Sequence, residues 1–197
     1  MEHYYSEKPE SELKIYEIPL NVLGLNCKIL SASGLFSKKK IDYGTRVLIE
    51  NCIIKDNDYV LDLGCGYGAI GIALALTKNI KVLMSDINER AIMIAKMNVK
   101  RFNLRDKVKV IKSNGFEKIK DKFDVILWNP PQTAGKKLCF RLIEEAKDHL
   151  KINGSLQLVA RHNKGGKSLM EKMKEVFNNV TTIAKYGGYR VYLSYKK

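Results

Sequence analysis

From Tyr59 onward, short apolar segments with the character of β-strands alternate with longer segments that have the spacing of amphipathic helices. Strands that are apolar on both faces and separated by helices form parallel sheets that helices cover on both sides. Strands are predicted at 59–64, 80–86, 107–114, 123–129 and 154–161, and helices at 68–78, 88–102, 134–151 and 165–177. The sequence therefore predicts an α/β fold with a doubly wound, mostly parallel sheet.

The two ends of the chain depart from this alternation. Residues 179–186 and 189–197 have strand character and flank Gly187-Gly188, which is typical of an antiparallel β-hairpin and brings the predicted sheet to seven strands. Residues 13–30 alternate apolar and polar side chains, which indicates a small N-terminal β element. A helix is expected within 41–53, with Asp42 available as its N-cap.

Length and composition limit the class of protein. At 197 residues the chain is most simply one structural domain, in which residues 1–57 are expected to pack on a core of residues 58–197. No apolar stretch is long enough to span a membrane, and residues 1–10 do not resemble a secretory signal, so we expect a cytoplasmic protein with no membrane partner. The four cysteines and three histidines form no ligand cluster, which argues against a metal site.

The charge of the chain bears on its partners. Lys and Arg total 35 against 21 Asp and Glu, a formal net charge of +14 that favours an anionic partner such as nucleic acid. The alternative is a lysine-rich solvated surface, although such surfaces usually carry acidic residues in similar number. Basic residues cluster at 38–40, 100–107, 136–137 and 161–167. We expect 38–40 and 136–137 to flank a pocket, and the other clusters to be solvated helix faces.

A glycine-rich segment, VLDLGCGYGAIG, places Gly64, Gly66 and Gly68 between the first strand of this alternation and its helix. Glycine permits a tight turn there and lets a ligand approach the backbone. The spacing also fits the dinucleotide-binding fingerprint. However, Asp62 stands two residues before the first glycine, where a carboxylate favours a cationic ligand over a pyrophosphate. A glycine turn between capped strand ends, without a ligand, is the structural alternative.

The next two strands also end in polar residues. Asp86 follows Asp62 by 24 residues, at a strand end where a carboxylate can accept hydrogen bonds from both hydroxyls of a ribose. Asn114, Gly115 and Phe116 follow the next strand; an amide and a flat ring there suit an adenine, and a plain Asn-Gly turn is equally expected. Together with the glycines, these residues predict a site for an adenosine ligand with a positive charge.

Asn129-Pro130-Pro131 follows the strand predicted at 123–129. Proline lacks an N–H and makes the preceding residue extended, so the Asn129 and Pro130 carbonyls are held rigidly without local donors. An NH2 group can donate one hydrogen to the Asn129 side-chain oxygen and the other to the Pro130 carbonyl, which turns its lone pair toward an electrophile. The electrophile is expected above the glycine loop, since both loops follow the carboxyl ends of neighbouring strands. Alternatively, the segment only ends a strand and starts a helix.

Together, VLDLGCGYGAIG, SDIN, SNGF and WNPPQTAGK resemble the class I S-adenosylmethionine-dependent methyltransferases over about residues 30–197. SGLFSKKKIDYGTRVLIE is similar to the RsmC-like family, which resembles small-subunit ribosomal RNA guanine-N2 methyltransferases. The resemblance implies a Rossmann-like sheet and S-adenosyl-L-methionine as cofactor. It also implies RNA as partner, with ribosomal RNA as the leading candidate. Many relatives carry an aromatic residue after the second proline, where this chain has Gln132. Stacking on the target base then comes from Phe36, Tyr67 or Trp128, or the base is held differently.

By this resemblance, several loops hold the methyl donor, and Asn129-Pro130-Pro131 is the catalytic segment that holds the target amine. The cofactor-binding residues are predicted to be Thr45, Asp62, Gly64, Cys65, Gly66, Gly68, Asp86, Ile87, Asn114 and Gly115. The substrate-binding residues are predicted to be Phe36, Lys38, Tyr67, Gln132 and Lys136. Phe36, Asp42 and Gly44-Thr45 match the family's lid over the cofactor.

The leading hypothesis is an N-methyltransferase that acts on an exocyclic amine of a base in RNA, and guanine N2 of ribosomal RNA is the favoured target. One rival is a methyltransferase of protein glutamine amides, which also offer an NH2 group; those enzymes usually carry a helical recognition domain and an aromatic after the prolines, and this chain shows neither. A second rival is a non-catalytic nucleic-acid-binding protein with the same fold. A dinucleotide-dependent oxidoreductase fits less well because of Asp62 and the Asn-Pro-Pro segment. The oligomeric state stays open, with a monomer slightly favoured.

Overall fold

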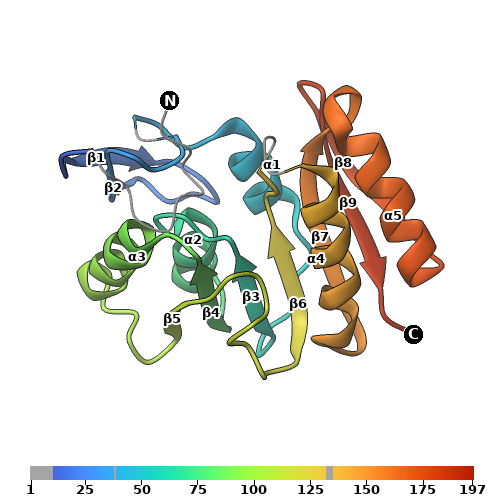
Figure 1. The fold of residues 1–197 in the computed structure, drawn as a ribbon. Coiled ribbons are helices and arrows are strands. Elements are labelled where there is room, and N and C mark those ends of the chain that lie inside the picture. Colours follow the sequence, from blue (N-terminus) through green and yellow to red (C-terminus); the bar gives the residue numbers. More distant parts are fainter. Residues whose placement is uncertain (1–10, 38, 132–134) are drawn as a thin grey trace.

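A seven-stranded sheet forms the centre of the molecule in the computed structural model, which describes residues 11–37, 39–131 and 135–197 (Figure 1). Its strands are β3 (Tyr59–Leu63), β4 (Lys81–Asp86), β5 (Val108–Lys112), β6 (Phe123–Trp128), β7 (Leu150–Arg161), β8 (Thr181–Tyr186) and β9 (Tyr189–Tyr195). The order is β5-β4-β3-β6-β7-β9-β8, with parallel pairing from β5 to β7 and antiparallel pairing of β9 with both β7 and β8. The predicted sheet and its C-terminal hairpin are confirmed.

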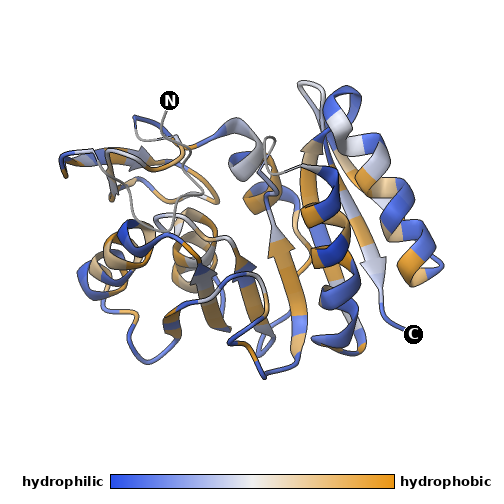
Figure 2. Cartoon of the chain, in the orientation of Figure 1, coloured by the Kyte–Doolittle hydropathy of each residue, from blue (hydrophilic) through white to orange (hydrophobic). Residues whose placement is uncertain are grey.

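Helices cover both faces of the sheet, and an apolar cluster fills the space on each side. α1 (Tyr43–Asn51), α2 (Ala69–Thr77) and α3 (Glu89–Arg101) pack on one face. α4 (Lys136–Asp148) and α5 (Lys167–Phe177) pack on the other. Figure 2 shows central strands that are hydrophobic along most of their length and helices whose outer sides are hydrophilic. None of the helices among the described residues is long and apolar enough to cross a membrane.

The N-terminal β element is a separate antiparallel pair, β1 (Ile15–Leu20) and β2 (Cys27–Ala32). Asn98 of α3 attaches it to the core. Its side-chain oxygen accepts from the Leu30 N–H at 2.9 Å, and its nitrogen donates to the Leu30 and Tyr67 carbonyls at 2.9 Å each. Asn98 is fully buried, so these bonds fix the β element and the glycine-rich loop to one helix. The division into residues 1–57 and 58–197 remains a proposal.

Several predicted boundaries shift by one or two residues, and the largest difference lies between α4 and β7. The helix expected over 134–151 ends at Asp148, and β7 already begins at Leu150 rather than near residue 154. The apolar spacing of the helix continues through Leu150, so the sequence does not mark its end. The stop comes from tertiary contacts: the Phe123 N–H donates to the His149 carbonyl at 2.9 Å, and Phe123 pairs with Leu150.

Replacing the buried Asn98 with Ala removes three hydrogen bonds and leaves the Leu30 and Tyr67 groups without them. We expect the free energy of unfolding to fall by about 2–3 kcal/mol, as for buried polar groups that lose their partners. Urea denaturation followed by circular dichroism measures this change. Lys100→Ala, at an exposed position of the same helix, should change it by less than about 0.5 kcal/mol. Equal effects of the two substitutions would contradict the role given to Asn98.

Candidate active site

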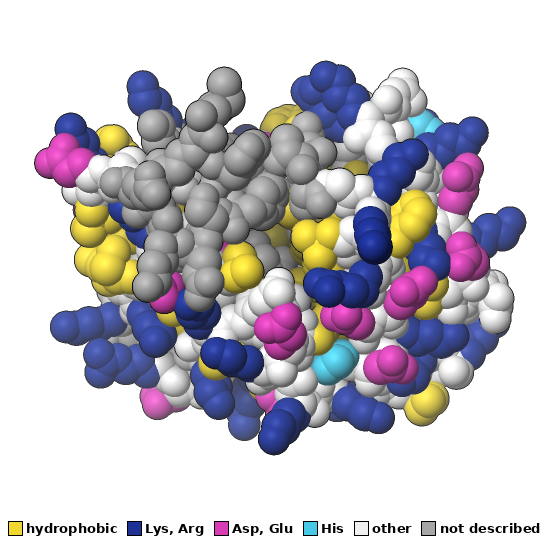
Figure 3. Space-filling model, viewed as in Figure 1, with side chains coloured by type: hydrophobic (Ala, Val, Ile, Leu, Met, Phe, Trp, Pro, Cys, Tyr) yellow, Lys and Arg dark blue, Asp and Glu magenta, His cyan; other side chains and the backbone are white. Residues whose placement is uncertain are grey.

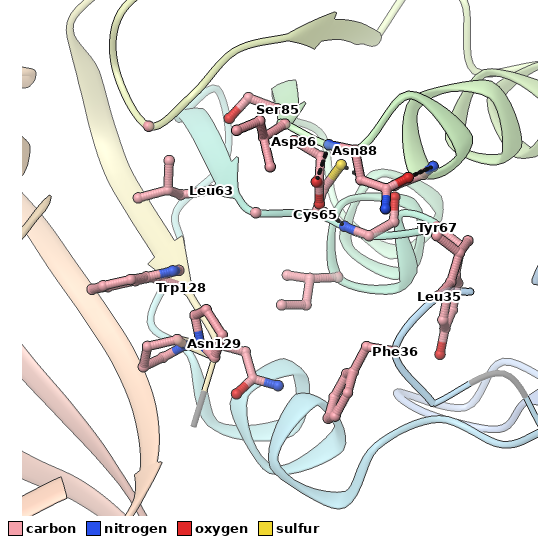
Figure 4. Close-up of a pocket in the computed structure, with 18 of the residues that line it drawn as sticks. Leu35, Phe36, Leu63, Cys65, Tyr67, Ser85, Asp86, Asn88, Trp128 and Asn129 are labelled. Atoms are coloured by element: carbon pink, nitrogen blue, oxygen red, sulfur yellow. Dashed lines mark hydrogen bonds between the residues drawn. The ribbon is translucent and has the colours of Figure 1, made fainter. Parts of the chain in front are cut away.

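A cavity opens at the carboxyl edge of the sheet, where β3, β4, β5 and β6 end (Figure 4). Segments far apart in the sequence line it, including the N-terminal segment before α1, the starts of α1 and α4, and the loops after these strands. The predicted site residues in its wall are Phe36, Thr45, Gly64, Cys65, Gly66, Tyr67, Asp86, Ile87, Asn114, Gly115, Asn129, Pro130 and Pro131. The glycine loop and the Asn-Pro-Pro segment therefore share one cavity.

Other predicted site residues lie elsewhere. Asp62, Gly68 and Lys136 are not in the cavity wall, and Lys136 is an exposed residue at the start of α4. Lys38 and Gln132 lie outside the described residues. Among the residues that the structure describes, no group of three or more His, Cys, Asp or Glu side chains is placed to hold a metal ion.

The glycine loop leaves open space above its backbone at two positions. Gly64 and Gly66 have left-handed φ angles of 66° and 57°. A Cβ at Gly66 would meet no atom within 4 Å, and one at Gly64 would meet only Trp128 Nε1, at 3.9 Å. A side chain at either position would stand in the cavity, so glycine there leaves room for a ligand. Gly68 differs: it precedes α2, and a Cβ there would lie 3.1 Å from Met84, which indicates a turning and packing role.

Asp86 ties the end of β4 to the glycine loop. Its Oδ2 accepts from the Gly66 N–H at 2.8 Å, and its Oδ1 accepts from the Asn88 N–H at 2.9 Å. Burial raises the pKa of Asp86 above its ordinary value, while these backbone N–H groups oppose the shift. The carboxylate therefore holds the two loops in a fixed relation at the cavity wall.

Asp62 lies beneath the loop, which differs from the expected position facing a ligand. It is fully buried, its Oδ2 accepts from the Gly71 N–H of α2 at 3.0 Å, and its Oδ1 has no hydrogen-bond partner among the described residues. Successive side chains of a strand point to opposite faces of the sheet, and Asp62 points to the face that α2 covers. Direct contact between Asp62 and a ligand in the cavity is therefore not supported.

The wall beside β4 and β5 contains both expected and unexpected groups. Asn114 lines it, with its amide nitrogen donating to Glu117 Oε1 at 2.7 Å. Phe116 does not line it: its ring stacks on His149, with 4.4 Å between centroids, so the expected contact with an adenine is wrong. Ser85 was not anticipated; its buried hydroxyl lines the cavity and has no partner among the described residues. The only sequence signal for Ser85 was its place before Asp86.

The Asn129 amide has a fixed orientation. Its Nδ2 donates to Asp42 Oδ2 at 3.1 Å and to Thr45 Oγ1 at 2.9 Å. An ionised carboxylate only accepts hydrogen bonds, so the amide nitrogen must face Asp42 and the amide oxygen must lie on the opposite side. Asp42 is itself fixed, because the same Oδ2 accepts from the Thr45 N–H at 2.9 Å as the N-cap of α1. The predicted cap is confirmed, whereas its link to Asn129 was not foreseen.

Aromatic side chains border the cavity on several sides. Figure 4 shows Trp128 and Asn129 across the central space from Tyr67 and Leu35, with Phe36 below that space, between Asn129 and Tyr67. Trp128 and Tyr67 are buried, whereas Phe36 is 41% exposed. Burial raises the pKa of Tyr67, and the Asp42 carboxylate adds to the shift. Tyr67 is therefore a neutral wall residue, and Phe36 is the aromatic side chain with a solvent-facing surface.

The chain is similar to known methyltransferases. It matches the family described as methyltransferase small domain over residues 26–193. It is 36% identical to the uncharacterized protein YbxB of Bacillus subtilis, over 96% of each chain. It is 34% identical to ribosomal RNA small subunit methyltransferase C of Haemophilus influenzae, over 94% of this chain and 56% of that protein.

Solved structures give the same picture of the fold. The T. thermophilus 16S rRNA N2 methyltransferase RsmC, in complex with AdoMet and guanosine, matches with a TM-score of 0.77 and 21% identity, over 96% of this chain and 52% of that one. A methyltransferase from Pyrococcus furiosus matches with a TM-score of 0.64 and 28% identity, over 73% of this chain and 77% of that one. The chain thus spans about half the length of the named ribosomal RNA relatives.

The buried Asp62 predicts a pH dependence of stability. Burial raises its pKa from 3.8 to about 7, the Gly71 N–H opposes this shift, and the Asp86 carboxylate adds to it. Because the folded pKa lies above the unfolded one, the stability linked to Asp62 is fully present below about pH 4 and is lost as the pH rises through about 7. Asp62→Asn cannot ionise and keeps an acceptor for Gly71. We expect its unfolding free energy, relative to wild type, to increase between about pH 4 and 7 and then level off. Urea titrations across this range measure it, and a constant difference would contradict the prediction.

Proposed function

The chain belongs to the methyltransferase small domain family, and we propose that it transfers a methyl group from S-adenosyl-L-methionine to an exocyclic amine of a base in RNA, with guanine N2 of ribosomal RNA as the leading target. The observation that carries this proposal is that Asn129-Pro130-Pro131 and the glycine loop line the same cavity. The relatives named as ribosomal RNA methyltransferases support the choice of RNA. A cytoplasmic location and a monomeric state remain part of the proposal.

The cavity wall fits an adenosine-containing methyl donor. Gly64 and Gly66 leave open space for it, the buried Ser85 hydroxyl is a polar group that a ligand can satisfy, and Asp86 is held at the wall, where it can accept from ribose hydroxyls. Ile87, Asn114 and Gly115 would border the adenine. When bound, S-adenosylmethionine supplies the methyl group and, as a sulfonium, the driving force for transfer. Asp62 contributes indirectly: it lies beneath the glycine loop and fixes the start of α2 by accepting a hydrogen bond from the Gly71 N–H.

The Asn-Pro-Pro segment would hold the target amine. The Asn129 oxygen and the Pro130 carbonyl each accept one hydrogen of the NH2 group, which directs the nitrogen lone pair into the cavity. Asp42 and Thr45 contribute indirectly: by binding the Asn129 amide nitrogen, they keep its oxygen in the accepting position. No side chain has to act as a general base to begin the reaction, since the neutral amine already carries the attacking lone pair.

Phe36 is the best placed aromatic residue to stack on the target base. It lines the cavity and is partly exposed, whereas Trp128 and Tyr67 are buried in the wall. The exposed part of Phe36 is accessible to a base that comes from solvent, and stacking on an aromatic ring is a usual way to hold an unpaired base. We therefore assign to Phe36 the role that relatives give to an aromatic residue at the position of Gln132. We assign Lys136, at the exposed start of α4, to a phosphate of the substrate, while the role predicted for Lys38 falls outside the described residues.

The substrate class is tested by incubating the protein with a methyl-labelled donor and total RNA, followed by nucleoside analysis. We expect label in N2-methylguanosine, and a loss of about 100-fold or more in rate for Asn129→Ala, because the amine then loses one of its two acceptors. Calorimetric titration should show donor affinity within about threefold of wild type, since Asn129 contacts the amine and not the donor. Label found only in protein would overturn RNA as the substrate. An Asn129→Ala rate within a few-fold of wild type would overturn the role of Asn129.

The orientation of the Asn129 amide is tested separately with Asp42→Asn. Asn caps helices about as well as Asp, so α1 should keep its N-terminus, but an Asn side chain can also donate and no longer forces the Asn129 nitrogen toward it. We expect kcat to fall by about tenfold while KM and donor affinity change less than about threefold. Asp56→Asn, an exposed position before β3, is the matched control. Equal kcat values for the two variants would exclude a positioning role of Asp42.

A further inference from the structure

Basic and aromatic residues gather at the same sheet edge as the cavity, on the side of β7, β8 and β9. β7 runs parallel to β6, so Arg161 at its end lies on the edge where Asn129 follows β6. β9 begins at this edge, with Tyr189 opposite Arg161, and β8 ends there. The residues of this edge surface are Tyr43, Arg161, His162, Lys164, Lys167, Lys185, Tyr186 and Arg190. Its position was not expected, because residues 161–167 were predicted to be a solvated helix face.

A continuous set of contacts joins the edge surface to the target loop. Asn129 binds Asp42 at 3.1 Å, and Tyr43 follows Asp42 in the chain. The Tyr43 ring packs against Tyr189 with 5.6 Å between centroids, and the Arg161 guanidinium lies 5.1 Å from the Tyr189 ring centroid. The edge surface therefore begins one residue from a side chain that orients the Asn129 amide.

The packing under this surface is tight. A Cβ at Gly44 would come within 2.7 Å of the Tyr189 ring, and one at Gly187 within 2.9 Å of the Tyr43 ring. The start of α1 and the β8–β9 turn are thus held in close contact. A ligand bound on the edge surface would meet a rigid platform rather than separate loops, which lowers the entropic cost of binding.

The edge surface has an excess of positive charge. Arg161, Lys164, Lys185 and Arg190 have no acidic partner among the described residues, and Lys167 has one at 4.0 Å, Glu171. The pKa of His162 reflects the positive charge around it. Burial, Arg190, Lys167 and Lys185 lower this pKa, while Glu171 opposes the shift. By contrast, Lys172 on α5 is paired with both Glu144 and Glu175. Unpaired like charges repel one another, so such a cluster favours an anionic ligand.

The surface also carries exposed aromatic rings. Tyr43 is 49% and Tyr186 is 53% exposed. Figure 3 shows Lys and Arg side chains and one histidine along the upper right of the molecule, over the β8–β9 turn and the start of α5 seen in Figure 1. Cations that contact phosphates, combined with rings on which bases stack, are the chemistry of single-stranded nucleic-acid binding. An acidic protein partner would need the cations but would give the exposed tyrosines no specific role.

We propose that the edge surface binds the phosphate backbone and the unpaired bases of the RNA strand next to the nucleotide whose amine enters the cavity. The proposal rests on the proposed function for the identity of the ligand. The unpaired cations Arg161, Lys164, Lys185 and Arg190 contact phosphates, and Tyr43 and Tyr186 stack on neighbouring bases. The strand passes from the β8–β9 turn across Tyr43 to the cavity, so that the base next to it is delivered to Asn129.

The test is a binding measurement that does not depend on methylation. Lys164→Gln, Lys167→Gln and Lys185→Gln are combined in one variant, and binding of a short fluorescein-labelled single-stranded RNA is followed by anisotropy over a range of salt concentrations. The matched control combines Lys100→Gln, Lys107→Gln and Lys109→Gln, which change the same charge at exposed positions on α3 and around β5. Circular dichroism and donor titration establish that both variants are folded.

We expect the edge variant to bind the RNA at least about tenfold more weakly than wild type. The slope of log K against log salt should fall in magnitude by about 1.4, since two of the three replaced lysines, Lys164 and Lys185, contact phosphates and each contact contributes about 0.7. The control variant should bind within about threefold of wild type. Tyr186→Ala should weaken RNA binding by about fivefold or more, and the salt dependence of binding should stay as in wild type, because a stacking contact involves no phosphate. In methylation assays the edge variant should raise KM for RNA and leave kcat within about twofold.

Other outcomes would overturn the proposal. Equal losses in the edge and control variants would mean that only net charge matters. Wild-type binding of an acidic peptide as tight as binding of RNA, with the same loss in the edge variant, would assign the surface to another partner. If only the edge-surface proposal is wrong, the wild-type protein still methylates RNA, and the edge variant has the same KM for RNA as wild type. Failure of the proposed function instead appears as an absence of methylated nucleosides, whatever the anisotropy shows.

Discussion

The hydrogen bonds from the Asn129 amide to Asp42 and Thr45 connect the parts of the molecule on which the proposed chemistry depends. They join the loop after β6 to the N-terminus of α1, and the same Asp42 oxygen caps that helix. One carboxylate therefore sets the direction of a helix, the orientation of an amide and the position of the residues that follow it. Because Asp42 Oδ2 accepts both bonds, the Asn129 oxygen is directed away from it, as the proposed acceptor pair with the Pro130 carbonyl requires.

Most of the fold was predictable from the sequence, because it follows from local patterns. Apolar strands alternating with amphipathic helices require a parallel sheet covered on both faces, and Gly187-Gly188 marks the terminal hairpin. The end of α4 was not predictable, since its apolar spacing continues into Leu150, and the helix ends where His149 and Leu150 meet Phe123 of β6. A boundary that tertiary contacts set leaves no mark on the local pattern.

The residues of the candidate site were likewise predictable only in part. Positions that need glycine or proline for backbone reasons, such as Gly64, Gly66 and Pro130, were predictable and lie in the cavity wall. How far each carboxylate lies from the cavity was not, because it depends on how the strands are aligned with one another. Asp62 pairs with Met84, so Asp62 and Asp86 point to the same face of the sheet, but Asp86 lies two residues nearer the carboxyl edge and reaches the wall, while Asp62 stays under the loop. Phe116, in the turn after β5, stacks on His149 instead. The partner of Asn129 is 87 residues away in the sequence and was beyond any local pattern.

The distribution of charge separates the cavity from the edge surface, which suits the two parts of the proposed RNA substrate. Asp42 and Asp86 line the cavity with Asp62 beneath it, and none of the described residues in the wall is Lys or Arg. Such a cavity attracts a cationic methyl donor and disfavours phosphates. The cations of the edge surface, including Arg161 and Arg190, lie outside the cavity wall, where phosphates can bind in contact with water. If RNA is the substrate as proposed, a neutral base is the part of the strand that the acidic cavity does not disfavour, and its phosphates stay at the edge surface.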